Sequence, residues 1–209
     1  MSDSKREAIL NAALEVFSEK GYHPATIDEI AERAGVGKGT VYSYFRSKSE
    51  LMEQLIEAAT DASLQSAEQR LAGLDNALDQ LRALADLQRE HLQQGEPFVR
   101  FLMADVQGAI SPEFKSCMEK AKRRLEEFVA GVIRRGQKEG VFKKQIDPRF
   151  GAILILALRA GLLHYWYSRQ ARPDVDADAL TRQAVEFVLH GLAAPGALEA
   201  GGPAPGSRA

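Results

Sequence analysis

The segment from Thr26 to Phe45 has room for only two short helices and a sharp turn, and this spacing constrains the fold more than any other feature. Thr26 and Glu29 form a capping box, in which the hydroxyl accepts a backbone N–H of the first turn and the glutamate reaches back. Gly35 follows nine residues after Thr26 and can adopt the positive φ that such a turn requires. The segment therefore predicts a helix-turn-helix.

Three residues at fixed intervals support this prediction. Ala31 is small where the two helices would cross, Gly35 lies four residues later in the turn, and Val41 lies six residues beyond it. Each position meets a separate steric requirement of the motif, because Val41 has to pack between the helices. The other apolar residues of the segment and two from the helix before it are expected to form a core: Ile27, Ile30, Ala34, Phe45, Val16 and Phe17.

Helix signals dominate the rest of the chain, and the alternation typical of strands is almost absent. Capping boxes at Ser4–Glu7 and Ser47–Glu50 predict two more helix starts, and Gly73 interrupts the apolar period that begins after Ser47. Later helices are expected to begin near Leu74, Pro97, Pro112, Pro148, and Asp176 or Asp178. The sequence thus predicts an all-α fold with about nine helices.

Composition bounds the class of protein. The chain has 209 residues, enough for one large domain or a small domain joined to a larger one. Its single cysteine, Cys117, excludes a disulfide framework and a cysteine-rich zinc module, and fits a reducing compartment. The N-terminus lacks the basic and apolar segments of a signal peptide, so we expect a cytoplasmic protein.

No catalytic signature is visible in the sequence. Glycine-rich phosphate loops and the HExxH zinc motif are missing, and no nucleophile, base and acid form a recognisable constellation. His91 and His164 are too few and too scattered to propose a metal site. We therefore expect neither an enzyme nor a bound cofactor or metal.

The second helix of the motif carries side chains suited to DNA. The net charge is −2, so a nucleic-acid contact has to come from a local patch, and residues 36–48 hold Lys38, Arg46 and Lys48 with no acidic residue. A lysine can reach a phosphate or a guanine edge, and a threonine can touch a thymine methyl. Tyrosine hydroxyls reach phosphate oxygens. The residues expected to project outward are Lys38, Gly39, Thr40, Tyr42 and Ser43, with Tyr44 near the helix end.

The stretch T-I-D-E-I-A-E-R-A-G-V-G-K-G-T-V-Y-S-Y-F-R-S-K-S-E-L (Thr26–Leu51) resembles the DNA-binding region of the TetR family of bacterial transcriptional regulators. The likeness extends to the preceding helix and Gly21-Tyr22, whereas the remainder resembles the family in length, helical content and its apolar pair of C-terminal helices. Gly37 departs from the commonest pattern, because many members carry a serine there, and a hydroxyl–phosphate contact is then lost.

The resemblance implies a DNA-binding domain over residues 1–47 and a helical effector-binding and dimerisation domain over 48–194. Residues 195–209, rich in Ala, Gly and Pro, are expected to form a disordered tail. The resemblance further implies a homodimer that places two recognition helices in successive major grooves of a pseudo-palindromic operator of double-stranded DNA. By motif position, phosphates would be contacted by Thr26, Tyr42, Tyr44 and Lys48, and bases would face Lys38, Gly39 and Thr40. For two of these residues a structural role is the alternative, as a helix cap for Thr26 and as core for Tyr44.

Residues 150–167 form an apolar stretch of eighteen residues in which only Arg159 and His164 are strongly polar. A helix that is apolar on all sides is buried on all sides, which favours a dimer interface formed with a helix near 178–192. A buried core of the monomer and a membrane span are the alternatives. A membrane span is disfavoured, because inserting Arg159 near the bilayer centre costs about 2.5–3.5 kcal/mol.

The resemblance also implies an effector site enclosed by the helices of the larger domain. Aromatic residues and methionine with a few polar groups suit an apolar or aromatic ligand, although the same residues can be plain core. The candidates are Phe98, Phe101, Met103, Phe114, Cys117, Met118, Phe128, His164 and Trp166. The basic region 115–144, with Lys122-Arg123-Arg124 and Arg134-Arg135, is expected to be a solvated helix face or, alternatively, to receive a phosphate-bearing ligand such as an acyl-CoA.

Together these features predict a ligand-responsive repressor that a small apolar or aromatic effector releases from its operator. The alternative is a DNA-binding regulator without a small-molecule effector, controlled by a protein partner.

Overall fold

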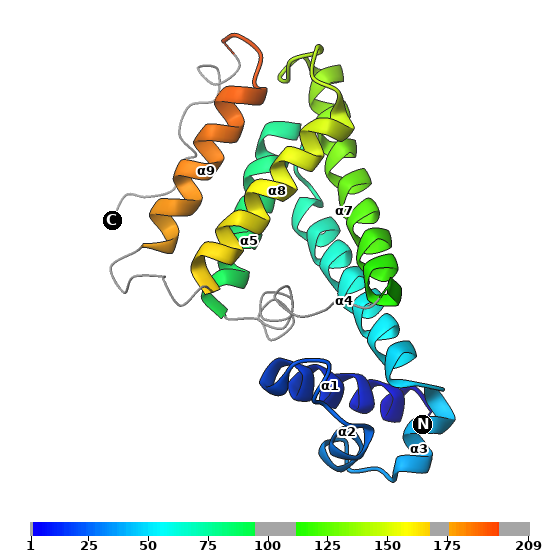
Figure 1. The fold of residues 1–209 in the computed structure, drawn as a ribbon. Coiled ribbons are helices and arrows are strands. Elements are labelled where there is room, and N and C mark those ends of the chain that lie inside the picture. The colour runs from blue at the N-terminus through cyan, green and yellow to red at the C-terminus, as the bar shows by residue number, and fades with distance from the viewer. Residues whose placement is uncertain (1, 95–111, 168–175, 197–209) are drawn as a thin grey trace.

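The computed structural model describes residues 2–94, 112–167 and 176–196, which form eight α-helices (Figure 1). The predicted all-α fold is confirmed, and the ninth predicted helix, near Pro97, lies outside the described residues. The helices are α1 (Ser2–Lys20), α2 (Ile27–Arg33), α3 (Lys38–Tyr44), α4 (Lys48–Leu71), α5 (Ala77–Gln94), α7 (Pro112–Glu139), α8 (Pro148–Tyr167) and α9 (Ala177–Leu192).

The capping box predicted for α2 is complete. The Thr26 hydroxyl accepts the Glu29 N–H at 3.3 Å, and the Glu29 carboxylate accepts the Thr26 N–H at 3.0 Å. The same carboxylate accepts a hydrogen bond from the Lys20 ammonium at 2.5 Å. This ammonium, with the two Thr26 donors, lowers the pKa of Glu29 to about 2. The α2 cap therefore also ties the end of α1 to the start of α2.

The other two predicted boxes differ from expectation. Ser47 caps α4 by accepting the Glu50 N–H at 3.0 Å, but the Glu50 carboxylate bonds the backbone N–H of Arg46 instead of that of Ser47. The box predicted at Ser4 is wrong as a helix start, because α1 already begins at Ser2. No glycine or proline separates these residues, so the helix extends past Ser4.

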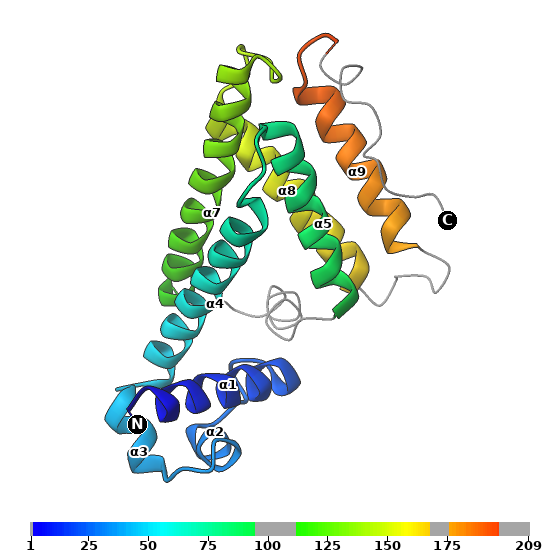
Figure 2. The ribbon, with the colours of Figure 1, turned by 180° about the vertical axis from the view of Figure 1, so that it is seen from behind.

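The core predicted for the helix-turn-helix is present. Ala31 and Val41 are buried between α2 and α3, and Gly35 adopts a φ of +66° in the turn between them. This cluster extends into the first half of α4 through Leu51 and Leu55, and Ala121 of α7 also joins it. Helix α4 thus runs from the N-terminal helices into the rest of the molecule, where α7 lies along it (Figures 1 and 2).

A second apolar cluster holds the larger part of the molecule together. It collects residues from the second half of α4, from α5, α7, α8 and α9, and from the α7–α8 connection. In that connection the buried ring of Phe142 covers Gly136, and Phe142 pairs with Ala193 in an isolated β-bridge. Lys143 donates hydrogen bonds to the carbonyls of His190 (3.2 Å) and Gly191 (2.8 Å), so the connection also closes the end of α9.

The apolar stretch 150–167 becomes α8, and only one side of this helix is buried within the chain. Gly151, Ala152 and Leu163 face the core, whereas Phe150 and Leu154 are 58% and 54% exposed. The interpretation of α8 as fully buried monomer core is therefore wrong, because no other described helix covers its outer side. No helix among the described residues is both long and apolar enough to cross a membrane.

We expect Gly136→Ala to destabilise the protein. A β-carbon at position 136 would lie 2.1 Å from Cδ2 of the buried Phe142 ring, which would have to move, at a cost of about 1–3 kcal/mol in the free energy of unfolding. The matched control is Gly131→Ala on the same helix, where the nearest atom lies 3.9 Å away. Here alanine should stabilise the helix by about 0.5–1 kcal/mol. Urea unfolding of both variants measures this, and equal shifts would contradict the expected packing.

Candidate DNA-binding surface and effector pocket

Helix α3 turns one side inward and presents the opposite side to solvent. The Val36 N–H donates to the Ala31 carbonyl at 3.0 Å, which closes the turn and sets the direction of α3. Val41 is completely buried under α2, so the side chains on the other face point away from the protein. Lys38, Gly39 and Tyr42 are exposed, with Tyr42 46% exposed, while Thr40 and Tyr44 are half-buried. Five of the seven predicted contact residues therefore lie on this one short helix, whereas Thr26 precedes α2 and Lys48 begins α4.

Lys38 is held by an acidic residue of α2 in the free protein. Its ammonium lies 2.9 Å from a carboxylate oxygen of Asp28, and both side chains are largely exposed. The hydrogen bond with Asp28, followed by its charge, raises the pKa of Lys38. Any phosphate or base edge that binds Lys38 therefore has to compete with Asp28.

Two predicted contact residues also have structural roles. The Thr26 hydroxyl caps α2 and donates to the Glu29 carboxylate at 3.0 Å, so its proton is already used. Tyr44 packs against the N-terminal cluster with its ring 6.4 Å from that of Phe45. The alternatives considered for these two residues therefore apply, and their contacts with DNA stay predictions, as do those of Lys38, Gly39, Thr40 and Tyr42.

Lys48 has a role that its place in the motif did not reveal. Its ammonium donates to the carbonyls of Tyr22 (2.9 Å), His23 (3.1 Å) and Ala25 (3.0 Å), and it lies 4.6 Å from the centre of the Tyr22 ring. Desolvation by the surrounding residues lowers its pKa. The first turn of α4 is therefore clamped to the α1–α2 loop. The phosphate contact predicted for Lys48 stays a prediction, and it requires the ammonium to share or give up one of these carbonyls.

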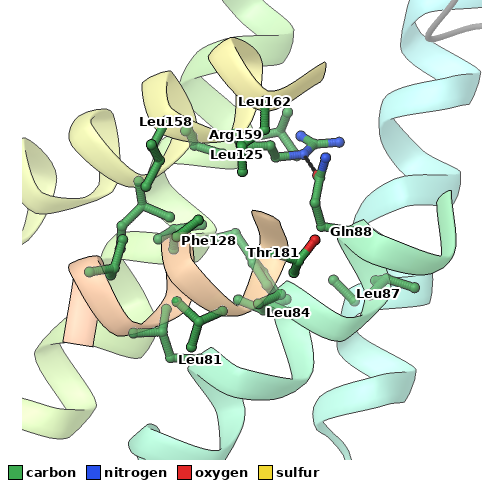
Figure 3. Close-up of a pocket in the computed structure, with 18 of the residues that line it drawn as sticks. Leu81, Leu84, Leu87, Gln88, Leu125, Phe128, Leu158, Arg159, Leu162 and Thr181 are labelled. Atoms are coloured by element: carbon green, nitrogen blue, oxygen red, sulfur yellow. Dashed lines mark hydrogen bonds between the residues drawn. The ribbon is translucent and has the colours of Figure 1, made fainter. Parts of the chain in front are cut away.

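A pocket lies in the larger part of the molecule, enclosed by α4, α5, α7, α8 and α9 (Figure 3). Its volume is about 950 Å³ when the part open to solvent is included, and its water-accessible interior is about 140 Å³. Its walls consist mainly of leucine with some valine, alanine and isoleucine, and Phe128 of α7 contributes one aromatic ring. An apolar pocket of this kind with few polar groups is typical of a small-molecule site.

The polar groups of the pocket are Gln88 of α5, Arg159 of α8, and Thr181 of α9, besides Ser63 of α4. The Arg159 Nε–H donates to the amide oxygen of Gln88, and Figure 3 shows Gln88, Arg159 and Thr181 on one side, away from Leu81 and Leu158.

One of the nine pocket residues predicted from the sequence, Phe128, lines this pocket. Phe98, Phe101 and Met103 lie outside the described residues. Phe114, Cys117 and Met118 pack instead against the N-terminal cluster, which includes the first half of α4, because the first turns of α7 lie beside α4. His164 is exposed and Trp166 half-buried near the end of α8, and neither lines the pocket. These five residues therefore do not line this pocket, and contact of any of the nine with an effector stays a prediction.

The pocket residues that sequence reasoning missed are mostly aliphatic, so they cannot be told from ordinary core by residue type. Arg159 carried the one usable signal, since a lone arginine inside an apolar helix needs a polar neighbour. The sequence alone could not show that this neighbour is Gln88, seventy-one residues earlier in the chain.

The basic region of α7 is an exposed helix face with several ion pairs. Arg124 pairs with Asp61 at 2.6 Å, and Arg135 pairs with Glu139 at 2.6 Å. Arg134 pairs with Glu127 at 2.5 Å. These contacts favour the solvated-face interpretation. Over residues 2–94, 112–167 and 176–196, no three His, Cys, Asp or Glu side chains form a group able to hold a metal.

Two family models match the chain. Residues 9–55 match the model described as bacterial regulatory proteins, tetR family. Residues 74–192 match the model described as tetracyclin repressor-like, C-terminal domain. The first match spans α2, α3 and their core, and the second spans four of the five helices around the pocket.

Individual proteins are similar over nearly the whole length. The HTH-type transcriptional repressor KstR2 of Rhodococcus jostii (strain RHA1) is 27% identical over 194 residues, covering 91% of this chain and 92% of that protein. The fatty acid degradation regulator FadR from Bacillus halodurans has a similar structure, with a TM-score of 0.80 at 20% identity, over 90% of this chain and 95% of that one. FadR from Bacillus subtilis, solved in complex with stearoyl-CoA, gives a TM-score of 0.77 at 22% identity, over 88% and 98%.

We expect Asp28→Asn to raise operator affinity. The substitution frees Lys38 from its ion pair and removes a negative charge beside it, so the gain should be about 2- to 5-fold and larger at low salt. Fluorescence anisotropy measures this with an operator selected from random duplexes by the purified protein. Glu68→Gln, an exposed charge change about 30 Å along α4 from Lys48, is the control and should leave affinity unchanged. Reduced affinity of Asp28→Asn would show that Asp28 itself contacts the operator.

Proposed function

Because the chain belongs to the tetR family of bacterial regulatory proteins, a family of DNA-binding transcriptional regulators, we propose that it represses transcription and leaves its operator when the pocket fills. One observation carries this proposal. Helix α4 is a single uninterrupted helix that begins at the Lys48 clamp on the DNA-binding unit and later forms a wall of the pocket. Both sites therefore share one rigid element.

The DNA-binding half of the proposal uses the exposed face of α3. Lys38, Gly39 and Thr40 would face base edges in the major groove, with Tyr42 on a flanking phosphate. Thr26, Tyr44 and Lys48 would approach phosphates at the edges of this face. Their existing contacts favour an additional positioning role, because they hold α2, α3 and α4 in their relative orientation.

The regulatory half depends on the length of α4. The pocket residues Ser63, Leu64 and Ala67 lie fifteen to nineteen residues after Lys48, which is about 22–29 Å along the helix. A ligand that separates α4 from its neighbours around the pocket would tilt the whole helix. The clamp would pass this tilt to the recognition helix, whose spacing to its partner has to match grooves about 34 Å apart. The ligand's preference for one dimer shape, typically worth about 1–3 kcal/mol, sets the strength of this coupling.

The pocket favours an effector with an apolar body. Its walls are almost entirely aliphatic, and such a site gains binding free energy from the apolar area that the ligand buries. The structure of Bacillus subtilis FadR with stearoyl-CoA shows that this fold holds a fatty-acyl ligand in that protein. For the present chain, the same class of apolar-chain effector fits the composition of the walls.

A homodimer completes the proposal, because one recognition helix reads only half of a two-fold operator. The outer sides of α8 and α9 expose apolar residues at helical spacing, with Phe150 and Leu154 on α8 and Phe187, 77% exposed, on α9. At Gly161 of α8 and Gly191 of α9, no atom from another element of residues 2–94, 112–167 and 176–196 lies within 4 Å of the space a β-carbon would occupy. A second copy of the chain can therefore approach both helices closely.

Phe187→Glu should dissociate this dimer. Each subunit would lose a buried aromatic side chain worth about 1.5–3 kcal/mol, which weakens dimerisation by about 100-fold or more and lowers operator affinity with it. Sedimentation equilibrium measures the dimer constant. Gln65→Glu on the exposed face of α4 is the control and should stay dimeric. A Phe187→Glu protein that remains a dimer would place the interface elsewhere.

Ser63→Phe should fill the pocket and make the protein insensitive to effector. Because the new ring enters existing space, the melting temperature and the operator affinity should stay close to those of the wild type, whereas overpacking of a solid core would cost about 1–3 kcal/mol. The measurement is operator release by a panel of apolar compounds, followed by anisotropy. Ala62→Phe, on the exposed neighbouring position of α4, should still respond.

Two results would contradict the proposal. If the Ser63→Phe protein responded like wild type, the effector would bind outside this pocket. If no apolar compound released the wild-type protein, the regulator without a small-molecule effector, controlled by a protein partner, would be favoured.

A further inference from the structure

Two buried polar groups in the pocket lack hydrogen-bond partners. Gln88 and Thr181 are 8% and 6% exposed. Within the described residues, neither Gln88 Nε2 nor Thr181 Oγ1 has a hydrogen-bond partner. A buried polar group without a partner is costly, so each such group in a folded protein calls for an explanation. Both residues line the pocket, which makes a ligand atom the natural partner.

The chemistry of Arg159 identifies which end of the Gln88 amide is unused. A guanidinium can only donate hydrogen bonds, so the atom of Gln88 that faces Arg159 Nε has to be the amide oxygen. The amide nitrogen, Nε2, is therefore the end of the side chain that does not bond to Arg159 Nε. Gln88 therefore offers two N–H donors to the pocket, and Thr181 offers a hydroxyl.

The donors of Gln88 and Thr181 suit a ligand oxygen that accepts hydrogen bonds, and the positive charge of Arg159 suits a negatively charged ligand group. Arg159 brings a permanent positive charge to the side of the pocket where Gln88 lies. Beside walls that are otherwise aliphatic, this positive charge favours a negative group over a neutral one. A carboxylate combines a negative charge with several acceptor sites, which matches two donor groups beside a guanidinium.

The size of the pocket limits the apolar part of the ligand. The interior of about 140 Å³ is close in size to an apolar cavity of about 150 Å³ that holds a benzene ring, and the pocket continues from there into space open to solvent. A chain of about six carbons therefore fills the interior, and a medium-length chain extends into the open part of the pocket.

We propose that the effector of this protein is a medium-chain aliphatic carboxylic acid, bound as the free carboxylate. Its oxygens accept hydrogen bonds from Gln88 Nε2 and Thr181 Oγ1 beside Arg159, and its chain lies among the leucines of α5, α7 and α8. This inference rests on the proposed function, and it adds the chemical class of the effector and the residues that recognise it.

The first test compares three probes that share one chain: decanoate, 1-decanol and decanoyl-CoA. Burying a carboxylate in an aliphatic pocket is costly, so a pocket without a polar recognition site binds the alcohol more tightly than the acid. We expect the opposite order, with decanoate bound at least about 10-fold more tightly than decanol by isothermal titration calorimetry. Decanoate, and not decanoyl-CoA, should also release the operator.

The second test uses variants that change single donors while keeping the shape of the site. Thr181→Val removes the unpartnered hydroxyl and should weaken decanoate by about 10-fold, with decanol unaffected. Gln88→Glu keeps an oxygen facing Arg159 and replaces the amide donors by a negative charge, so its loss for decanoate should be larger. Thr181→Ser keeps the hydroxyl and should bind decanoate like the wild type.

The variants are not expected to unfold, because Thr181→Val removes a hydroxyl that has no partner within the described residues. Its melting temperature should equal or exceed that of the wild type. A clear fall would show that the hydroxyl is already bonded, and would overturn the inference.

Three binding results would also overturn the inference while leaving the proposed function intact. They are decanol bound as tightly as decanoate, unchanged decanoate affinity in both Thr181→Val and Gln88→Glu, and operator release by decanoyl-CoA alone. If none of the three probes binds, the inference fails, and the Ser63→Phe comparison with the wider panel decides the proposed function separately.

Discussion

The hydrogen bonds of the Lys48 ammonium are the interaction on which the coupling of this molecule depends. Three carbonyls of the α1–α2 loop surround a cation at the first residue of α4. Backbone carbonyls hold this half-buried ammonium well, since they accept hydrogen bonds from its protons without adding a flexible partner. The start of α4 therefore moves with the α1–α2 loop, and a rotation of α4 has to be shared by α1, α2 and α3, which pack together in one cluster.

The opposite end of the same helix meets a different physical environment. There α4 contributes to a pocket whose walls are aliphatic, and whose interior is not filled by the side chains around it. Close packing normally removes such space, because each void forfeits dispersion contacts. A ligand that fills this pocket contacts α4, whose first residue is bound to the α1–α2 loop. Ligand binding can therefore change the relative free energies of different orientations of α4 and the helices attached to it.

Local signals explain why much of the fold could be predicted. The Thr26–Glu29 box and the prolines at 112 and 148 mark helix starts with contacts or dihedral angles that lie within one turn. The spacing of Ala31, Gly35 and Val41 likewise describes contacts within about ten residues, so the turn and the buried face of α3 followed from sequence. The start of α1 did not, because a helix end is decided by small differences among neighbouring residues.

The sequence by itself determined the helices, the helix-turn-helix and which side of α3 faces solvent, since each depends on residues close together in the chain. Only the tertiary structure decided where space is left and which polar groups meet there. Gln88, Arg159 and Thr181 come from three different helices, so no sequence pattern places them together. A leucine that fills a core cannot be told by its residue type from one that lines a pocket. Whether space stays unfilled depends on how side chains from several helices pack together, and no local pattern of residues encodes that packing.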